Sequence, residues 1–311
     1  MRVGVFVSET WDAASPLSEV RERAQRAEAL GLASGWVPYL PWALDALASL
    51  QAAGEVTRRI ELGSAVIPTF FFHPLALARQ AATVQAAIGR PLTLGIGCSN
   101  QFVVEMHGLA YERPAQQVRE YLELLARAAA GSGRADYQGE IYHTAALYAA
   151  PGTSASPVLV GALGPQMLRI AGELSDGAIG TCCNERAIER ELAPALRRAA
   201  SAAGRGEPRV ATVVPVALVS DAAAARERAE QHFRVYDGLP RYRRMVELGG
   251  ARSAADVCAI GGESELRRRL RGYRDAGLTD LLAAPFAAGE PRAESWERTV
   301  ACLAALAPEL A

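Results

Sequence analysis

Short apolar runs alternate with helical patterns along the whole chain. Eight of these runs have few polar residues and no clean period of two, which is typical of parallel strands buried on both faces. Each run is followed by a segment whose apolar residues recur at helical spacing. The predicted strands are Arg2–Val7, Ser34–Val37, Ile60–Ile67, Leu92–Gly97, Val158–Gly161, Gly177–Thr181, Arg209–Val219 and Asp280–Ala284.

Eight strands that alternate with helices predict an α/β fold, a (β/α)8 barrel that spans residues 1–311 as one domain. An open, doubly wound sheet is the competing architecture, because alternation alone does not distinguish a closed sheet from an open one. No GxGxxG motif follows the first strand, so the usual dinucleotide fingerprint of the open fold is missing.

Two insertions interrupt the repeat. After the fourth strand come a loop, a helix and a small hairpin at residues 137–144. After the seventh strand, residues 220–262 form a mainly helical segment that contains Arg241, Arg243 and Arg244. Within the seventh strand we expect Pro215 at a bend or at the strand start, because proline removes a ladder hydrogen bond. A single long helix is expected over 186–203.

Composition excludes several classes of partner. The 33 basic and 34 acidic residues nearly cancel, so no overall field attracts nucleic acid or an anionic membrane. All 33 basic residues are arginine, so a bound phosphate must be held by guanidinium groups or backbone N–H groups. The five cysteines lack CxxC spacing, which argues against a zinc site or a disulfide framework. With no signal sequence or membrane-length apolar run, we expect a cytoplasmic enzyme.

The stretch from Glu61 to Pro74, ELGSAVIPTFFFHP, predicts one wall of a pocket. It begins as a buried strand, and Pro68 ends that strand because proline cannot donate a ladder hydrogen bond. Phe70, Phe71 and Phe72 follow and would form an apolar wall, although aromatic residues at such positions also serve as ordinary core.

Ligands of (β/α)8 barrels bind at the carboxyl ends of the strands, so the residues after each strand form the expected site. These residues are mainly apolar, amide or hydroxyl in character and lack the dense acids of a metal centre. The segment VLVGALGP ends a strand and starts a helix with Gly164-Pro165, an arrangement that suits a phosphate, or that is ordinary turn chemistry.

The order of several motifs resembles the luciferase-like monooxygenase family, and in particular its branch that uses the deazaflavin coenzyme F-420. These motifs are LGSAV, PT, the aromatic run, HP and RQAATVQ, then GIGCSNQFVVEMHG, YERP, REYLELL and YQGE. The resemblance implies a cis peptide bond at Ala65–Val66 that lies against the back of the coenzyme ring. It also implies a phosphate-bearing tail at the loop before the fifth helix. The coenzyme-binding residues that it implies are Ala65, Val66, Ile67, Ser99, Asn100, Gly161, Ala162, Leu163, Gly164, Pro165, Thr181 and Cys182.

Three ionisable groups of the family are absent from this chain. Many relatives have Asp-His where this chain has Tyr39-Leu40, Glu or Ser-His where it has Ser99-Asn100, and a lysine where it has Asn184. Tyr39 is the first candidate for a replacement proton donor, because a phenol can donate a proton or polarise a carbonyl, and Asn100 is a candidate hydrogen-bond donor. Glu9, Glu105 and His107 are alternatives, and each of these side chains has a purely structural interpretation as well.

We therefore expect an F-420-dependent oxidoreductase that transfers hydride to or from a small apolar organic molecule, with C=C or C=N reduction as the favoured reaction. The expected substrate pocket consists of Glu9, Phe70, Phe71, Phe72 and His107. Two alternatives stay open: an FMN-dependent monooxygenase, and a redox-inactive barrel that serves as a cyclase, binding protein or partner subunit. A homodimer is also compatible with the sequence.

Overall fold

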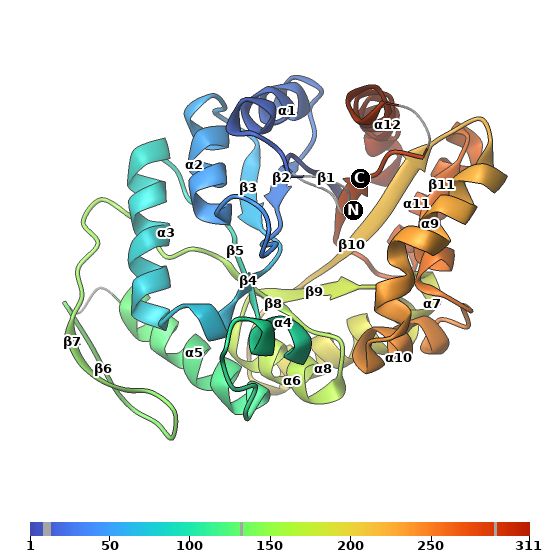
Figure 1. The fold of residues 1–311 in the computed structure, drawn as a ribbon. Helices are drawn as coiled ribbons and strands as arrows, with labels where there is room; N and C mark the ends of the chain where they lie inside the picture. Colours follow the sequence, from blue (N-terminus) through green and yellow to red (C-terminus); the bar gives the residue numbers. More distant parts are fainter. Residues whose placement is uncertain (9–13, 131–132, 289–290) are drawn as a thin grey trace.

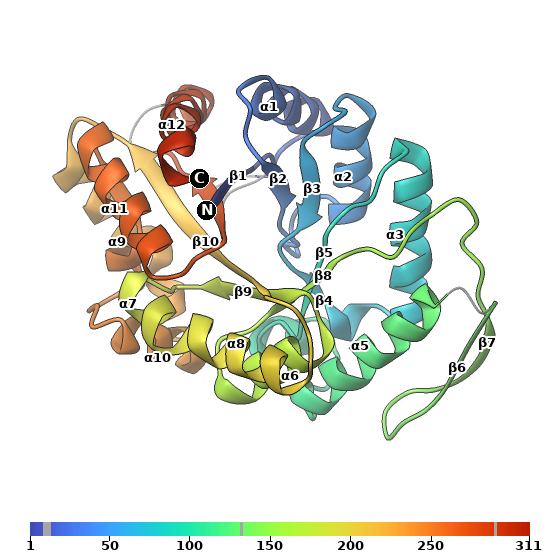
Figure 2. The same ribbon diagram turned by 180° about the vertical axis from the view of Figure 1, so that it is seen from behind.

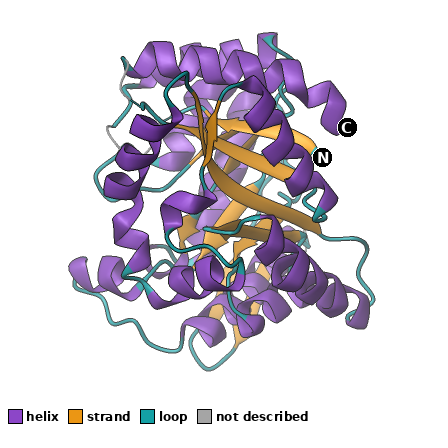
Figure 3. Ribbon diagram, turned by 90° about the vertical axis from the view of Figure 1, so that its right-hand side faces the viewer, coloured by secondary structure: helices purple, strands orange, loops and turns teal. Residues whose placement is uncertain are grey.

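The computed structural model describes residues 1–8, 14–130, 133–288 and 291–311, and it shows parallel strands enclosed by helices (Figures 1 and 3). The strands are β1 (Arg2–Phe6), β2 (Ser34–Val37), β3 (Glu61–Ser64), β4 (Ile67–Pro68), β5 (Leu94–Gly97), β8 (Val158–Gly161), β9 (Gly177–Thr181), β10 (Arg209–Leu218) and β12 (Asp280–Pro285). The outer helices are α1 (Leu17–Ala29), α2 (Ala46–Glu55), α3 (Pro74–Ile88), α5 (Pro114–Ala129), α6 (Pro165–Leu174), α8 (Ala193–Ala202), α11 (Glu263–Asp275), α12 (Arg292–Leu306) and the short η4 (Ala307–Leu310).

The sheet closes into a barrel at the third predicted strand. The strand order is β3-β2-β1-β12-β10-β9-β8-β5-β4, and β3 and β4 are the two halves of that predicted strand. Beside β5, the Thr93 N–H donates to the carbonyl of Leu62 over 2.8 Å, and the Ser64 N–H donates to the carbonyl of Thr93 over 3.1 Å. These contacts join β3 to the same neighbour that β4 pairs with. The barrel is therefore confirmed, and the open sheet is wrong.

The break between β3 and β4 is the cis peptide bond Ala65–Val66, at the position that the family resemblance implies. The chain then forms the short 3-10 helix η1 (Thr69–Phe71) and enters α3 with Pro74 in its first turn. His73 precedes α3 and accepts a hydrogen bond from the Leu75 N–H. As predicted, proline begins the helix where its missing N–H has no intrahelical partner.

The insertion after β10 is helical, as predicted, but it also contains a strand that the sequence analysis missed. It consists of α9 (Ala222–Asp237), α10 (Pro240–Leu248), η3 (Ala254–Val257) and the short strand β11 (Ala259–Gly261). β11 pairs in parallel with the end of β10, with Ala259 opposite Val216.

The prediction for Pro215 was wrong, because this residue lies inside β10 and not at a bend or strand start. The position of β11 explains why proline is tolerated there. β10 pairs with β9 up to Val213 and with β11 only from Val216 onward. Pro215 therefore falls in the gap between these two neighbours, where a residue without an N–H is tolerated.

The helix expected over 186–203 contains an irregular turn. Its parts are α7 (Glu185–Ala187), the π-helical turn η2 (Ile188–Leu192) and α8. Pro194 lies at the start of α8, and a proline removes one intrahelical hydrogen bond, which accounts for the wider turn before it. The insertion after β5 consists of α4 (Gln101–Met106) and, after α5, an antiparallel hairpin of β6 (Arg134–Gln138) and β7 (His143–Leu147). This hairpin is longer than predicted, and it projects from the barrel in Figures 1 and 2.

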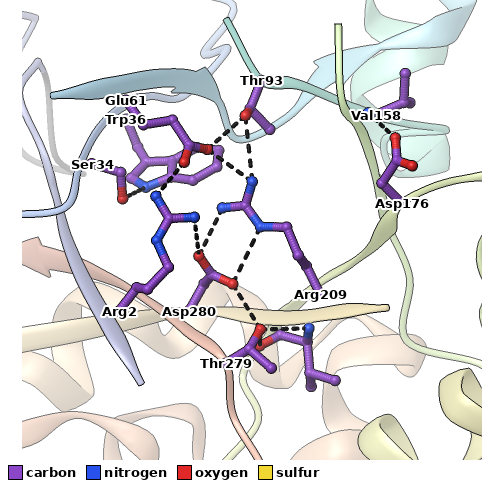
Figure 4. A network of polar contacts seen from close by, with 11 residues as sticks. Arg2, Ser34, Trp36, Glu61, Thr93, Val158, Asp176, Arg209, Thr279 and Asp280 are labelled. Carbon is purple, nitrogen blue, oxygen red and sulfur yellow. Dashed lines mark hydrogen bonds and ion pairs between the residues drawn. The ribbon is translucent and has the colours of Figure 1, made fainter. Parts of the chain in front are cut away.

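Charged side chains close the amino-terminal end of the barrel (Figure 4). Arg2, Glu61, Arg209 and Asp280 are the first residues of β1, β3, β10 and β12. Arg209 forms ion pairs with Glu61 at 2.8 Å and with Asp280 at 2.7 Å, and Arg2 contacts both acids. The ring of Trp36 lies 6.0 Å from the Arg209 guanidinium. This end is thus filled by a structural network, which leaves the opposite end for a ligand.

Candidate active site

The carboxyl ends of the strands open toward α4 and α10, which both lie on the near side of the barrel in Figure 1. At this end the bulge between β3 and β4 exposes part of Ala65 and Val66, whereas the flanking Ile67 is 1% exposed. A Cβ atom at Gly97 would lie 2.9 Å from a methyl of Val66, and one at Gly161 would lie 3.2 Å from it. The glycines that end β5 and β8 therefore make room for the Val66 side chain.

Aromatic side chains form a wall beside this bulge. Phe71 lies between Tyr39 and His107, with ring centroids 5.8 Å and 4.4 Å apart respectively. Phe72 meets Tyr39 edge-on at 5.9 Å. Phe70 stacks on Tyr111 at 5.1 Å. Phe70, Phe71 and Phe72 are each only partly buried, so part of this wall is accessible to a ligand.

Tyr39 and His107 offer different chemistry at the two edges of Phe71. Burial, with a smaller contribution from Asp45, raises the pKa of Tyr39 above its ordinary value, so its phenol is neutral near pH 7 and can donate a hydrogen bond. His107 Nδ1 lies 2.8 Å from the Val103 carbonyl oxygen and donates a hydrogen bond to it, which leaves Nε2 as the second polar atom of the ring. Glu105, the other alternative on α4, is exposed and accepts a hydrogen bond from Gln101.

The end of β5 turns sharply into α4. Ser99 has a φ of +60°, which is uncommon for a residue with a side chain and is typical of functional sites. Asn100 caps α4, because its Oδ1 accepts from the Val103 N–H at 3.0 Å. The cap leaves the Asn100 amide NH2 for a ligand.

The loop after β8 leads into an open helix end. Gly161, Leu163 and Gly164 are partly exposed, Ala162 is buried, and Pro165 is the first residue of α6. In the described part of the chain no side chain caps α6, and a Cβ at Gly164 would meet nothing within 4 Å. Backbone N–H groups at such an end, with the positive end of the helix dipole, suit an anion.

The end of β9 makes a second sharp turn, with a φ of +57° at Cys182. Thr181 and Cys182 line a narrow cavity that reaches Phe233 and Tyr236 of α9. Asn184, where relatives have lysine, caps α7 through Oδ1 and donates from Nδ2 to the Gly249 carbonyl at 3.1 Å. It thus holds the insertion in place.

Two residues of this end were missed as site candidates. Tyr111 precedes α5, and Arg241 lies on α10, and the Arg241 Nη1 lies 3.1 Å from the Tyr111 Oη. Both come from insertions, and no pattern in the sequence indicates which side chain of an insertion turns inward. Glu9, which was predicted in the pocket, lies outside the described residues.

The described residues contain one larger groove, and it lies away from this site. A groove of about 510 Å³ lies between α3 and α5, and none of the predicted site residues lines it. Across residues 1–8, 14–130, 133–288 and 291–311, no three His, Cys, Asp or Glu residues are grouped as metal ligands would be. In the same ranges no helix is both long enough and apolar enough to span a bilayer.

Comparison with known proteins identifies the family of this chain. The profile of the luciferase-like monooxygenase family matches residues 1–301. The chain is similar to the F420-dependent glucose-6-phosphate dehydrogenase of Mycolicibacterium gilvum, with 28% identity over 85% of this chain and 87% of that protein. It is similar to the enzyme of that name from Intrasporangium calvum, with 30% identity over 85% of this chain and 87% of that protein.

A solved structure shows the same fold. The coenzyme F420-dependent tetrahydromethanopterin reductase of Methanopyrus kandleri superposes with a TM-score of 0.76 and 17% identity, over 99% of this chain and 98% of that chain. The resemblance inferred from the sequence motifs is thereby confirmed. This chain belongs to the luciferase-like monooxygenase family of oxidoreductases.

Proposed function

We propose that this protein is an oxidoreductase that uses coenzyme F-420 and exchanges hydride with an apolar organic substrate. The observation that carries the proposal is the partly exposed bulge at the Ala65–Val66 cis peptide bond, which lies between two strands of the barrel and is followed in the chain by the aromatic wall. Similarity to F420-dependent relatives at 28–30% identity supports the choice of coenzyme.

The residues present fit such a coenzyme. Gly97 and Gly161 accommodate the Val66 side chain, and Ala65 and Val66 stay partly exposed at the bulge, where a flat ring would lie. The loop from Gly161 to Pro165 presents an uncapped helix end with open space at Gly164, which suits the coenzyme phosphate. When bound, the coenzyme supplies a hydride donor and acceptor, and the protein supplies binding, orientation and exclusion of water.

The protein groups around the substrate are suited to orient it and to move a proton. Phe70, Phe71 and Phe72 offer an apolar surface that excludes water, and this favours an apolar substrate over a sugar phosphate. The neutral phenol of Tyr39 can donate a proton or a hydrogen bond to a group beside Phe71. The Asn100 amide can donate to a carbonyl of the substrate or coenzyme.

The coenzyme assignment is tested by titrating the purified protein with F-420 and, separately, with FMN, while following absorbance and fluorescence. We expect binding of F-420 and reduction or oxidation of its chromophore with an apolar partner. Binding of FMN alone would instead indicate the monooxygenase alternative. Binding of neither would indicate a barrel without redox activity.

The phosphate position is tested by a matched pair of variants at Gly164. Both Asp and Asn are good helix N-caps, and the site is open, so Gly164→Asp and Gly164→Asn should fold equally well. Only the aspartate adds negative charge where the phosphate is proposed. We expect Gly164→Asp to weaken F-420 binding well beyond Gly164→Asn, and equal affinities would remove the phosphate from this loop.

A further inference from the structure

The further inference concerns Arg241, a charged residue at the carboxyl end of β5. Arg241 belongs to the insertion after β10, yet its Nη1 lies 3.1 Å from the Oη of Tyr111 and 3.5 Å from the Sγ of Cys98. Its guanidinium lies 5.9 Å from the centre of the Tyr111 ring. Contacts with a phenol, a cysteine sulfur and an aromatic ring thus hold this cation beside the end of a barrel strand.

No acidic side chain among the described residues pairs with Arg241. In the described ranges it forms no ion pair, whereas the next two arginines of α10 are paired: Arg243 with Glu247 at 2.7 Å and Arg244 with Glu191 at 2.9 Å. The contacts found for Arg241 use Nη1 alone, so the rest of its planar fork of donors is available to an oxyanion.

The helix that carries Arg241 also contacts the loop after β8. Arg244 lies one helical turn further along α10, on the same face, and its Nη1 donates to the Leu163 carbonyl at 3.2 Å. The pair of arginines therefore spans the ends of β5 and β8, beside the uncapped end of α6. An unmatched guanidinium next to an anion-binding helix end favours a ligand with more than one negative group.

We propose that Arg241 binds an anionic group on the tail of the coenzyme and selects a tailed coenzyme over its bare ring system. This inference rests on the proposed function and adds to it a residue outside the loop from Gly161 to Pro165. Tyr111 is the positioning residue, because its hydroxyl and its ring hold the guanidinium in place.

The test compares two ligands: F-420, and its deazaflavin core, which lacks the phosphate and the carboxylate tail. Binding of each is measured by fluorescence titration of the purified protein. We expect Arg241→Gln to bind F-420 about tenfold to a hundredfold more weakly, and to bind the core within about twofold of the wild type. Affinity of the wild type for F-420 should also fall more steeply with salt than that of Arg241→Gln.

Two further variants separate charge from structure. Arg243→Gln removes a paired arginine from the same helix and should leave both affinities unchanged. Tyr111→Phe keeps the ring but removes one contact of Arg241, and it should weaken F-420 binding less than Arg241→Gln does.

The outcomes distinguish this inference from the proposed function. If Arg241→Gln loses affinity for both ligands equally, or for neither, the role of Arg241 is refuted while F-420 dependence stands. If the wild type binds neither ligand, both proposals fail.

Discussion

The strongest stability prediction concerns Arg209→Met at the amino-terminal end of the barrel. The Arg209 side chain is 20% exposed and pairs with Asp280, which is 2% exposed, and with Glu61, which is 22% exposed. Removal of one partner from a buried ion pair leaves an uncompensated charge and costs about 3 to 5 kcal/mol. Arg2 still contacts both acids, so we expect the lower limit, a loss of about 3 kcal/mol in the free energy of unfolding.

Urea unfolding followed by circular dichroism measures this loss. With a denaturant slope of about 3 kcal/mol per molar, the midpoint should fall by about 1 M. The control is Arg21→Met, which removes an exposed pair with Glu55 at 3.4 Å and should cost less than about 1 kcal/mol. If Arg209→Met costs no more than Arg21→Met, the charged network at this end of the barrel does not stabilise the fold.

Two predictions concern single groups. Burial alone would raise the pKa of Glu61, but Arg209, Thr93 and Arg2 outweigh it and hold the pKa below its ordinary value. The stabilisation by Glu61 is therefore present above about pH 4.5 and is lost as the pH falls through the lowered pKa. Glu61→Gln should therefore unfold at a lower urea concentration than the wild type at pH 7. At acid pH the urea midpoints of the two proteins should become equal. Tyr39→Phe should keep the fold and the coenzyme affinity but slow turnover by about a hundredfold in steady-state assays, and a small effect would point instead to Asn100, Glu9 or His107.

The alternation of strands and helices could be predicted from the sequence because it depends on regular patterns, while the choice of a closed barrel also needed the missing dinucleotide motif and the family resemblance. Short apolar runs such as Leu94–Gly97, bounded by glycine, are typical of strands covered on both faces. The position of Ala65–Val66 came from the family resemblance and not from any local rule. β11 was missed because it has only three residues, and so short a pattern cannot be distinguished from a loop in the sequence.

The candidate site residues that follow barrel strands could be placed from topology. Tyr39, Asn100 and Gly164 lie two or three residues after the ends of their strands, so topology alone predicts them at one end of the barrel. Tyr111 and Arg241 come from insertions, and they meet across 130 positions of sequence. Only tertiary packing brings such residues together, and their spacing in the chain carries no signal of it.

The pairing of β11 with β10 has a consequence for protein engineering. Because Val216 and Ala259 are opposite each other in the same sheet, the two ends of the intervening segment are anchored one strand spacing apart, about 4.8 Å. A segment with fixed, adjacent ends can be exchanged for a related one without altering the length of any barrel connection. Chimaeras that take residues between these anchors from other members of the family should therefore fold, and they would vary the rim that carries Arg241 while the barrel stays the same.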